Sequence, residues 1–365
     1  MTSYSEWQNA RSRRAFLRSI AASAVGAYAI GRGGLHAQGQ SQRRLVTIGG
    51  RRIRVIDGHA HCVIPVQHVT KGTPLEKMGG GAGNNLLGPE RLQAMDQQGV
   101  DVQALTINSG FWWYGADADL ARKVVLAQNE GLAQWVAAHP DRFVAIASVA
   151  VQHPELAAEQ LRDGVKRLGL RGASIGCHCN GEDLSLPRFD PFWAAAAELG
   201  VPVFTHPGGA ENIVKEGAFR GRGDLGNIIG NPLETTYLLS RLIFDGTFDK
   251  FPNLRVIGAH AGGYLPSYFG RTEAACEFRG NAKCANTKKP SDYLRSQIVI
   301  DTMVFSDEGL RHLVAEAGVG QVVYGTDVPF NWPVTVDLVL NAKYLSDGEK
   351  EAILSSNLMK LLRIN

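Results

Sequence analysis

Short apolar runs and longer amphipathic runs alternate along the chain from residue 46 to the C-terminus. The apolar runs predict eight strands, at 52–57, 101–107, 143–149, 170–176, 201–205, 254–259, 297–301 and 321–326. Runs with helical periodicity lie between them, for example at 117–138, 154–168, 190–199, 233–245, 307–317 and 347–362. Strands that alternate with helices form a parallel sheet, and eight such units predict an α/β fold, the closed (β/α)8 TIM barrel.

Residues that can bind a metal stand at the ends of four of these runs. His59 and His61 follow the first run, His206 ends the fifth, His260 the sixth and Asp327 the eighth. In a strand, residues i and i+2 share a face, so the first two histidines can bind one ion. The C-terminal ends of barrel strands meet at one rim, where such barrels keep their active sites. The pattern predicts a mononuclear metal enzyme.

An open, doubly wound sheet is the alternative fold. The first predicted strand is not followed by the glycine-rich turn that is typical of dinucleotide-binding sheets. An open sheet would also spread the candidate ligands along a line, whereas a closed barrel gathers them. The barrel is therefore the favoured fold.

Imidazole and carboxylate ligands suit Zn²⁺, which we expect here, although Mn²⁺ is possible with the same ligands. The run that ends near residue 176 contains no lysine (171–178 reads RGASIGCH), whereas binuclear barrels often carry a carbamylated lysine at this place. One divalent ion is therefore expected. Such an ion can activate water or polarise a bound carbonyl or carboxylate.

Residues 1–37 differ from the rest of the chain. Arg13 and Arg14 precede Phe16-Leu17 and a mildly apolar segment, which is the pattern of a twin-arginine signal peptide; a basic tail or an uncleaved anchor is the alternative. Cleavage after Ala37 would leave a barrel domain over 46–365. We expect a periplasmic protein that is exported already folded.

The positive net charge of +3 belongs to this N-terminal segment. Residues 1–37 carry five arginines and one glutamate, so the remainder has a net charge of −1. We expect no nucleic-acid partner and no membrane contact after cleavage. Cys276 and Cys284 can form a disulfide in an oxidising compartment, or they are idle thiols.

Two further side chains are candidates for binding substrate. His178 follows the fourth predicted strand and would face the metal rim, although a packed loop histidine is equally compatible with this position. Trp113 lies in the aromatic cluster Phe111–Tyr114, which can stack on a planar substrate or form a hydrophobic lid or dimer contact.

Taken together, the motifs resemble the amidohydrolase superfamily of metal-dependent hydrolase-type barrels, and within it the branch typified by aminocarboxymuconate semialdehyde decarboxylase. The resemblance covers nearly all of 53–335. It rests on the segments DGHAH (57–61), MDQQGV (95–100), GASIGCH (172–178), THP (205–207), FPNL (251–254), AHAGG (259–263) and GTDVPF (325–330).

The resemblance implies a metal bound by His59, His61, His206 and Asp327, with His260 as the acid/base and Asp327 counted with it as catalytic. The implied activity is decarboxylation of a small unsaturated or aromatic carboxylic acid; the alternative is a lactonase or amidase on the same barrel. Arg271 falls where the family carries an arginine that crosses a homodimer interface to a substrate carboxylate, although an ordinary surface ion pair would also explain it.

One feature departs from the typical enzyme of that branch. A second carboxylate-binding arginine of the type enzyme lies in the insertion after the first strand. Here that glycine-rich segment contains Lys71 and Lys77 but no arginine before Arg91. Lysine pairs with a carboxylate as a point charge rather than as a bidentate fork, so we expect a different substrate.

Overall fold

The computed structural model describes residues 43–76 and 86–365. The predicted signal peptide (1–37) and Lys77 lie outside the described residues. No helix in the described part of the chain is long and apolar enough to span a membrane.

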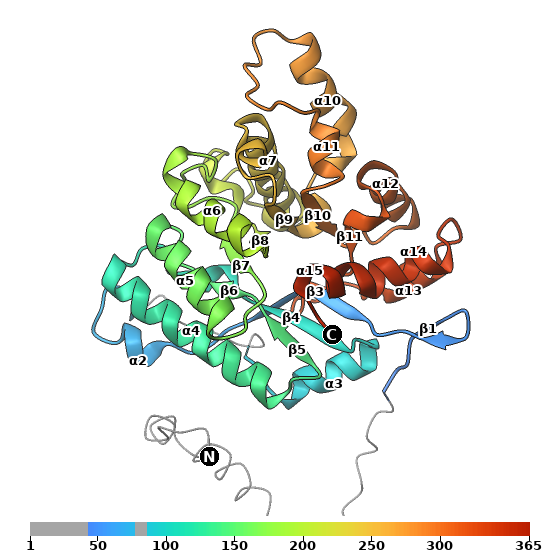
Figure 1. Ribbon diagram of the computed structural model, residues 1–365, viewed down its shortest axis with the longest axis horizontal. Helices are drawn as coiled ribbons and strands as arrows, with labels where there is room; N and C mark the ends of the chain where they lie inside the picture. The colour runs from blue at the N-terminus through green and yellow to red at the C-terminus, as the bar shows by residue number, and fades with distance from the viewer. Residues whose placement is uncertain (1–42, 77–85) are drawn as a thin grey trace, which may run out of the picture. The chain divides into compact units, whose positions relative to one another are not determined.

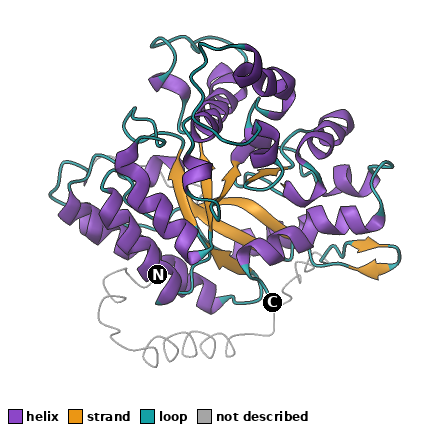
Figure 2. Cartoon of the chain, turned by 45° about the horizontal axis from the view of Figure 1, so that its top comes forward, coloured by secondary structure: helices purple, strands orange, loops and turns teal. Residues whose placement is uncertain are grey.

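The described residues form a barrel of parallel strands with helices around it (Figures 1 and 2). The strands are β1 (Thr47–Ile48), β2 (Arg51–Arg52), β3 (Ile56–Cys62), β4 (Val102–Ile107), β5 (Phe143–Ala145), β6 (Ala147–Ser148), β7 (Ala173–Gly176), β8 (Pro202–His206), β9 (Arg255–Gly258), β10 (Ile298–Asp301) and β11 (Val322–Val323). The helices are α2 (Gln67–Thr70), α3 (Pro89–Gln98), α4 (Ala118–Ala138), α5 (Pro154–Lys166), α6 (Asp190–Leu199), α7 (Asn231–Phe244), α8 (Thr247–Lys250), α9 (Ala259–Gly262), α10 (Phe269–Phe278), α11 (Pro290–Leu294), α12 (Asp307–Ala317), α13 (Val336–Asn341), α14 (Asp347–Glu351) and α15 (Asn357–Leu362).

Hydrogen bonds close the strands into a barrel. One sheet has the order β3-β4-β5 and the other β11-β10-β9-β8-β7-β6, with parallel pairing throughout. Ile146 joins the two sheets, because it lies between β5 and β6 and its N–H donates to Leu105 O. The remaining seam closes between β3 and the segment after β11, where His61 N donates to Val328 O at 2.8 Å. The predicted (β/α)8 fold is confirmed.

Alternate residues of the strands pack in two layers. On β8, Val203 belongs to the core between strands and helices, whereas Phe204 belongs to a separate cluster with residues of β3, β9, β10 and β11. Leu358 and Leu362 of α15 complete this inner cluster. The Phe204 ring centroid lies 5.0 Å from that of His59, so the inner cluster supports the site described below.

The first barrel strand begins later than the hydrophobic pattern predicts. Residues 47–52 form the antiparallel hairpin β1–β2, and β3 runs from Ile56 to Cys62 instead of covering 52–57. All seven residues of β3 are buried, including both histidines. The hydrophobic pattern placed the end of this strand too early, because the buried residues at its C-terminal end are polar residues of the site described below.

Candidate metal centre

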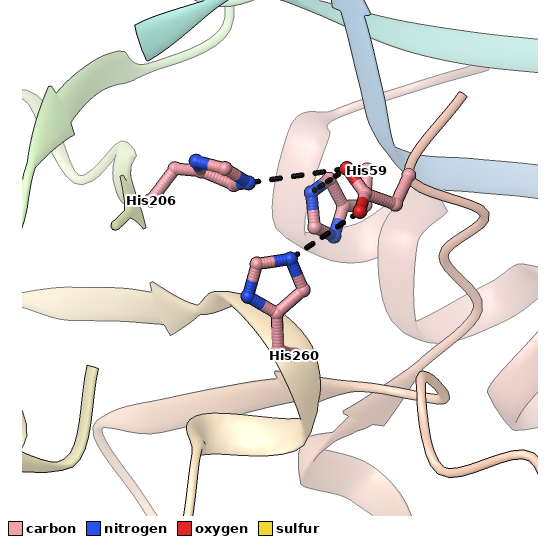
Figure 3. A group of neighbouring side chains, drawn as sticks. His59, His206 and His260 are labelled. Carbon is pink, nitrogen blue, oxygen red and sulfur yellow. Dashed lines mark hydrogen bonds and ion pairs between the residues drawn. The ribbon is translucent and has the colours of Figure 1, made fainter. Parts of the chain in front are cut away.

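Five predicted residues meet at the C-terminal end of the barrel. His59 and His61 come from β3, His206 ends β8, His260 follows β9, and Asp327 follows β11. The Asp327 Oδ1 atom lies 3.1 Å from His59 Nε2, 3.0 Å from His61 Nε2 and 3.9 Å from His206 Nε2. Figure 3 shows His59, His206 and His260 pointing toward one another around a shared carboxylate.

An irregularity in β3 turns the two histidines toward this centre. The pairing of β3 with β4 shifts register between Asp57 and Ala60. The buried Asp57 carboxylate holds the irregular segment, because it accepts hydrogen bonds from His59 N and from the Thr326 N–H and hydroxyl. Burial raises the pKa of Asp57 to about 6, even though these hydrogen bonds oppose the shift. The same carboxylate thus connects the strand of His59 to the segment of Asp327.

Oxygen atoms hold the Nδ1 side of three imidazoles, so that Nε2 faces the centre. The pairs are His59 Nδ1 with Asp301 Oδ2 at 2.7 Å, His206 Nδ1 with Pro207 O at 2.8 Å, and His61 Nδ1 with Thr106 Oγ1 at 3.3 Å. A histidine that binds a metal through Nε2 commonly donates Nδ1–H to such an oxygen. The environment therefore favours the tautomer that a metal requires.

The nitrogen and oxygen atoms that converge at the centre carry too few protons to form hydrogen bonds with all of their neighbours. His59 Nε2 and His61 Nε2 are 3.1 Å apart, and both face Asp327 Oδ1. His206 Nε2 is also buried and has no hydrogen-bond partner among the described residues. A single proton on His59 Nε2 can serve only one of these acceptors, whereas a divalent cation satisfies all of them at once. The residues present therefore fit the expected metal.

Burial and charge set the protonation of the metal-free centre. Burial lowers the pKa of His61 to about 4 and that of His206 well below its usual value. Burial also acts against protonation of His59, but the adjacent Asp327 and Asp301 carboxylates outweigh it and raise the pKa of His59 to about 10. The metal-free centre thus keeps one proton on His59, and a metal ion would take its place.

Asp301 is a residue of this site that sequence reasoning missed. Its Oδ2 atom binds His59 Nδ1 and accepts from His260 N at 3.0 Å, while its Oδ1 accepts from Ala261 N at 2.7 Å and Met303 N at 3.1 Å. Burial alone would raise the pKa of Asp301, but the hydrogen bond and ion pair with His59 lower it. The sequence did contain a signal for Asp301, because this residue, like the predicted ligands, lies at the end of an apolar strand.

His260 occupies a strained turn beside the ligands. His260 and Ala261 have positive φ angles of 55° and 58°, which non-glycine residues adopt at a cost, and Asp301 holds both N–H groups. The His260 Nε2 atom lies 3.4 Å from Asp327 Oδ2, on the carboxylate oxygen opposite the one that faces the other histidines. Its Nδ1 atom is buried without a hydrogen-bond partner among the described residues. His260 is therefore placed to exchange a proton next to a bound metal.

His178 lies at the rim and contacts Glu234 rather than the five central residues. Its Nδ1 accepts from Gly181 N at 2.9 Å, which leaves the proton of the neutral ring on Nε2, 3.7 Å from Glu234 Oε1. Burial lowers the pKa of His178 and raises that of Glu234 to about 8. The Glu234 carboxylate also accepts from Gly208 N at 3.3 Å, two residues after His206.

Trp113 and Arg271 lie apart from the central residues. Trp113 has a φ of 59° and packs in a cluster with Val66, Leu75 and Val124, so the residue is only 5% exposed. Arg271, on α10, is exposed and takes part in none of the ion pairs found within 43–76 and 86–365. The surface ion pair considered for Arg271 is therefore absent from the described part of the chain. Farther along α10, Cys276 forms a disulfide with Cys284.

The chain is similar to known decarboxylases over most of its length. It is 33% identical over 283 residues to 2-amino-3-carboxymuconate-6-semialdehyde decarboxylase of Dictyostelium discoideum, covering 75% of this chain and 76% of the relative. The structure of 5-carboxyvanillate decarboxylase from Sphingomonas paucimobilis superposes with a TM-score of 0.77 at 26% identity, covering 86% of this chain and 100% of that chain.

A third comparison concerns a structure that contains a metal. The 5-carboxyvanillate decarboxylase of Novosphingobium aromaticivorans, in complex with manganese and 4-hydroxy-3-methoxy-5-nitrobenzoic acid, superposes with a TM-score of 0.77 at 25% identity, covering 90% of this chain and 100% of that chain. Together with the histidine–aspartate centre, this likeness supports one divalent ion. The family described as Amidohydrolase matches residues 56–364, nearly the whole barrel. The chain therefore belongs to the amidohydrolase family, as the resemblance of its motifs predicted.

Proposed function

We propose that this chain is a metal-dependent decarboxylase of a small unsaturated or aromatic carboxylic acid. The observation that carries the proposal is the set of buried, proton-poor acceptor atoms around Asp327, with His260 on the free oxygen of the same carboxylate. The relatives named above support it, because each is a decarboxylase of a carboxylated aromatic or muconate compound. Hydrolysis of a lactone or amide is the alternative that the experiment below separates.

His59, His61, His206 and Asp327 would hold the ion. Three of the donor atoms, from His59, His61 and Asp327, are 3.0–3.1 Å apart. His206 Nε2 lies farther away, 3.9 Å from Asp327 Oδ1. These imidazole and carboxylate donors would suit Mn²⁺ or Zn²⁺, and the manganese of the related structure supports Mn²⁺ beside the Zn²⁺ that the sequence had placed first.

The bound ion supplies a positive charge that orients the substrate carboxylate and the group next to it. His260 donates a proton to the carbon that carries the carboxylate. The bond between this carbon and the carboxyl carbon then breaks, its electron pair returns to the carbon framework, and CO₂ leaves. One proton is consumed for each CO₂ released. Asp327 Oδ2, 3.4 Å from His260 Nε2, orients the imidazole.

Substrate contacts beyond the metal are assigned to Arg271, His178 and Trp113. The exposed Arg271 would reach a neighbouring subunit of a homodimer and pair with a substrate carboxylate there. Exposed apolar side chains near Arg271 support such an interface, namely Tyr268 just before α10, at 67%, and Phe278 at the end of α10, at 76%. His178 would donate its Nε2–H to substrate, and Trp113 would act by closing the aromatic cluster beside the site.

We also propose that the enzyme works in the periplasm after export by the twin-arginine route. The order of motifs within residues 1–37 supports the route. The disulfide between Cys276 and Cys284 supports an oxidising compartment, because disulfides are rare in the cytosol.

The test combines metal analysis with a panel of substrates. The protein, purified without added metal, is assayed for bound ions and then for CO₂ release from hydroxylated benzoic acids and carboxymuconates, and for hydrolysis of lactones and amides. One equivalent of Mn²⁺ or Zn²⁺ with CO₂ release supports the proposal. Hydrolysis without CO₂ release would replace it by the alternative, and activity that survives complete chelation would overturn the role of the metal.

A further inference from the structure

A cavity lies beside the metal centre but does not include it. The cavity has a volume of about 500 Å³ and lies between α3 and the segment that follows Asp327. Its lining combines polar side chains with aromatic and small ones, among them Arg91, Gln98, Gln103, Phe330, Trp332 and Ala94. None of the four proposed metal ligands lines it. Its size is typical of a site for a small organic molecule.

Arg91 brings an unpaired positive charge to this cavity. The residue is 7% exposed, and its Nη2 atom donates to the backbone oxygen of His61. Its Nη1 atom is buried without a hydrogen-bond partner in the described ranges 43–76 and 86–365, and no ion pair there involves Arg91. The undescribed segment 77–85 reads KMGGGAGNN and contains no acidic residue. The buried Asp57 carboxylate acts on this guanidinium only at longer range, without an ion pair, so an anion in the cavity would supply a direct partner.

The side-chain amides of Gln103 and Gln98 require a hydrogen-bond donor on the ligand. Gln103 is 1% exposed, and its Nε2 donates to Asp57 Oδ2, which fixes the amide orientation. Its Oε1 atom is buried and lacks a partner among the described residues, as does Gln98 Oε1. These oxygens accept hydrogen bonds and would repel a second anionic group. A hydroxyl group on the ligand would donate to one of them.

The remaining walls are suited to an apolar ring. Phe330 is 44% exposed, and the Trp332 ring stacks on Phe305 with centroids 5.1 Å apart. Glu90 also lines the cavity, but its side chain is exposed, so solvent screens its charge. The complementary ligand is therefore an aromatic ring that carries one carboxylate and a hydroxyl group.

We propose that this cavity is a second small-molecule site, which binds a hydroxylated aromatic carboxylate independently of the metal. Arg91 Nη1 would pair with the carboxylate, and Gln103 Oε1 would accept from the hydroxyl. The same guanidinium holds the His61 carbonyl, so one side chain connects this site to a strand of the metal centre. The proposal does not depend on decarboxylation, because the site contains no metal ligand.

The test uses calorimetric titration of the full-length protein, with its metal removed by a chelator, with 2-hydroxybenzoate. We expect binding to the metal-free protein, and at least tenfold weaker binding of the uncharged 2-hydroxybenzamide, which cannot form the charge-assisted pair. Ala94→Trp fills the cavity from α3 and should weaken 2-hydroxybenzoate binding at least tenfold. Gln97→Trp is the matched control, because Gln97 is exposed on the same helix and does not line the cavity.

Two results would overturn the proposal. The first is the absence of binding to the wild-type protein without metal, which needs no variant and cannot come from misfolding. The second is unchanged binding by a folded Ala94→Trp variant, which would place the anion at the empty metal centre instead. A crystal of the wild-type protein soaked with 5-bromo-2-hydroxybenzoate should show bromine in the cavity beside Arg91, and bromine found only at the metal centre would also refute the proposal.

Discussion

Asp301→Asn is the substitution that most directly tests how the metal centre is held. The Asp301 carboxylate accepts four hydrogen bonds, two at each oxygen: from His59 Nδ1 and His260 N at Oδ2, and from Ala261 N and Met303 N at Oδ1. Asparagine has nearly the same shape but accepts at one end only. Its NH₂ group must therefore face two donors, whichever way the amide is turned.

The size of the effect follows from these contacts. A hydrogen bond to a charged group contributes ~1.5–3 kcal/mol, so the loss of two predicts a decrease of ~3–6 kcal/mol in the free energy of unfolding. Removing an outer partner of a metal-binding histidine typically lowers metal affinity ~10–100-fold. We expect both effects, because Asp301 holds the His59 ring as well as the turn that contains His260.

The assay is a competition titration of Mn²⁺ and Zn²⁺ against a fluorescent chelator, together with urea unfolding of the metal-free protein. Asp117→Asn is the control, because Asp117 is an exposed N-cap of α4 and asparagine caps equally well. A folded Asp301→Asn protein with wild-type metal affinity would refute the assigned role of Asp301 in holding His59.

Three further predictions concern the same region. His260→Ala should keep its metal but lose turnover by ~10²–10⁴-fold, and undiminished turnover would remove His260 from the mechanism. Burial raises the pKa of Glu234 to about 8, from ~4.3 in an unfolded chain, so the folded state binds this proton more tightly. The stability that this proton contributes is fully present below pH ~4.3 and is lost as the pH rises through 8. The free energy of unfolding of Glu234→Gln should therefore fall less between pH 5 and pH 8.5 than that of wild type. Parallel curves of unfolding free energy against pH for the two proteins would contradict this assignment. A Cβ on Gly325 would lie 2.9 Å from His59 Cβ and 2.9 Å from Asp301 Cβ. Gly325→Ala should therefore lower the free energy of unfolding by ~1–3 kcal/mol and weaken metal binding. Gly320→Ala is the control, because a Cβ at Gly320 has open space. Equal unfolding free energies for the two alanine variants would show that the close approach at Gly325 is not required.

Much of the barrel was predictable because its signals are local. The predicted helices at 117–138, 190–199 and 307–317 agree with α4, α6 and α12 to within one residue. Their apolar faces and end residues lie in the same short segments; for example, α6 is capped at its C-terminus by Gly200, whose φ of 59° suits glycine. The boundaries of β3 were predicted less well, since its buried histidines interrupt the apolar pattern, and the predicted strand 143–149 and helix 347–362 are each divided in the structure.

The sequence by itself determined the order of strands and helices, and with it the five residues that meet at the rim. This was possible because a parallel barrel brings all strand ends to one side, so position along the chain predicts position in space. Only the tertiary structure decided how those residues are held. Three features join segments far apart in the chain. They are the hydrogen bond of Asp301 with His59, the contact of Glu234 with His178 and Gly208, and the cavity beside Arg91. Contacts of this kind depend on side-chain packing between strands and helices, which no local pattern of hydrophobic and polar residues encodes.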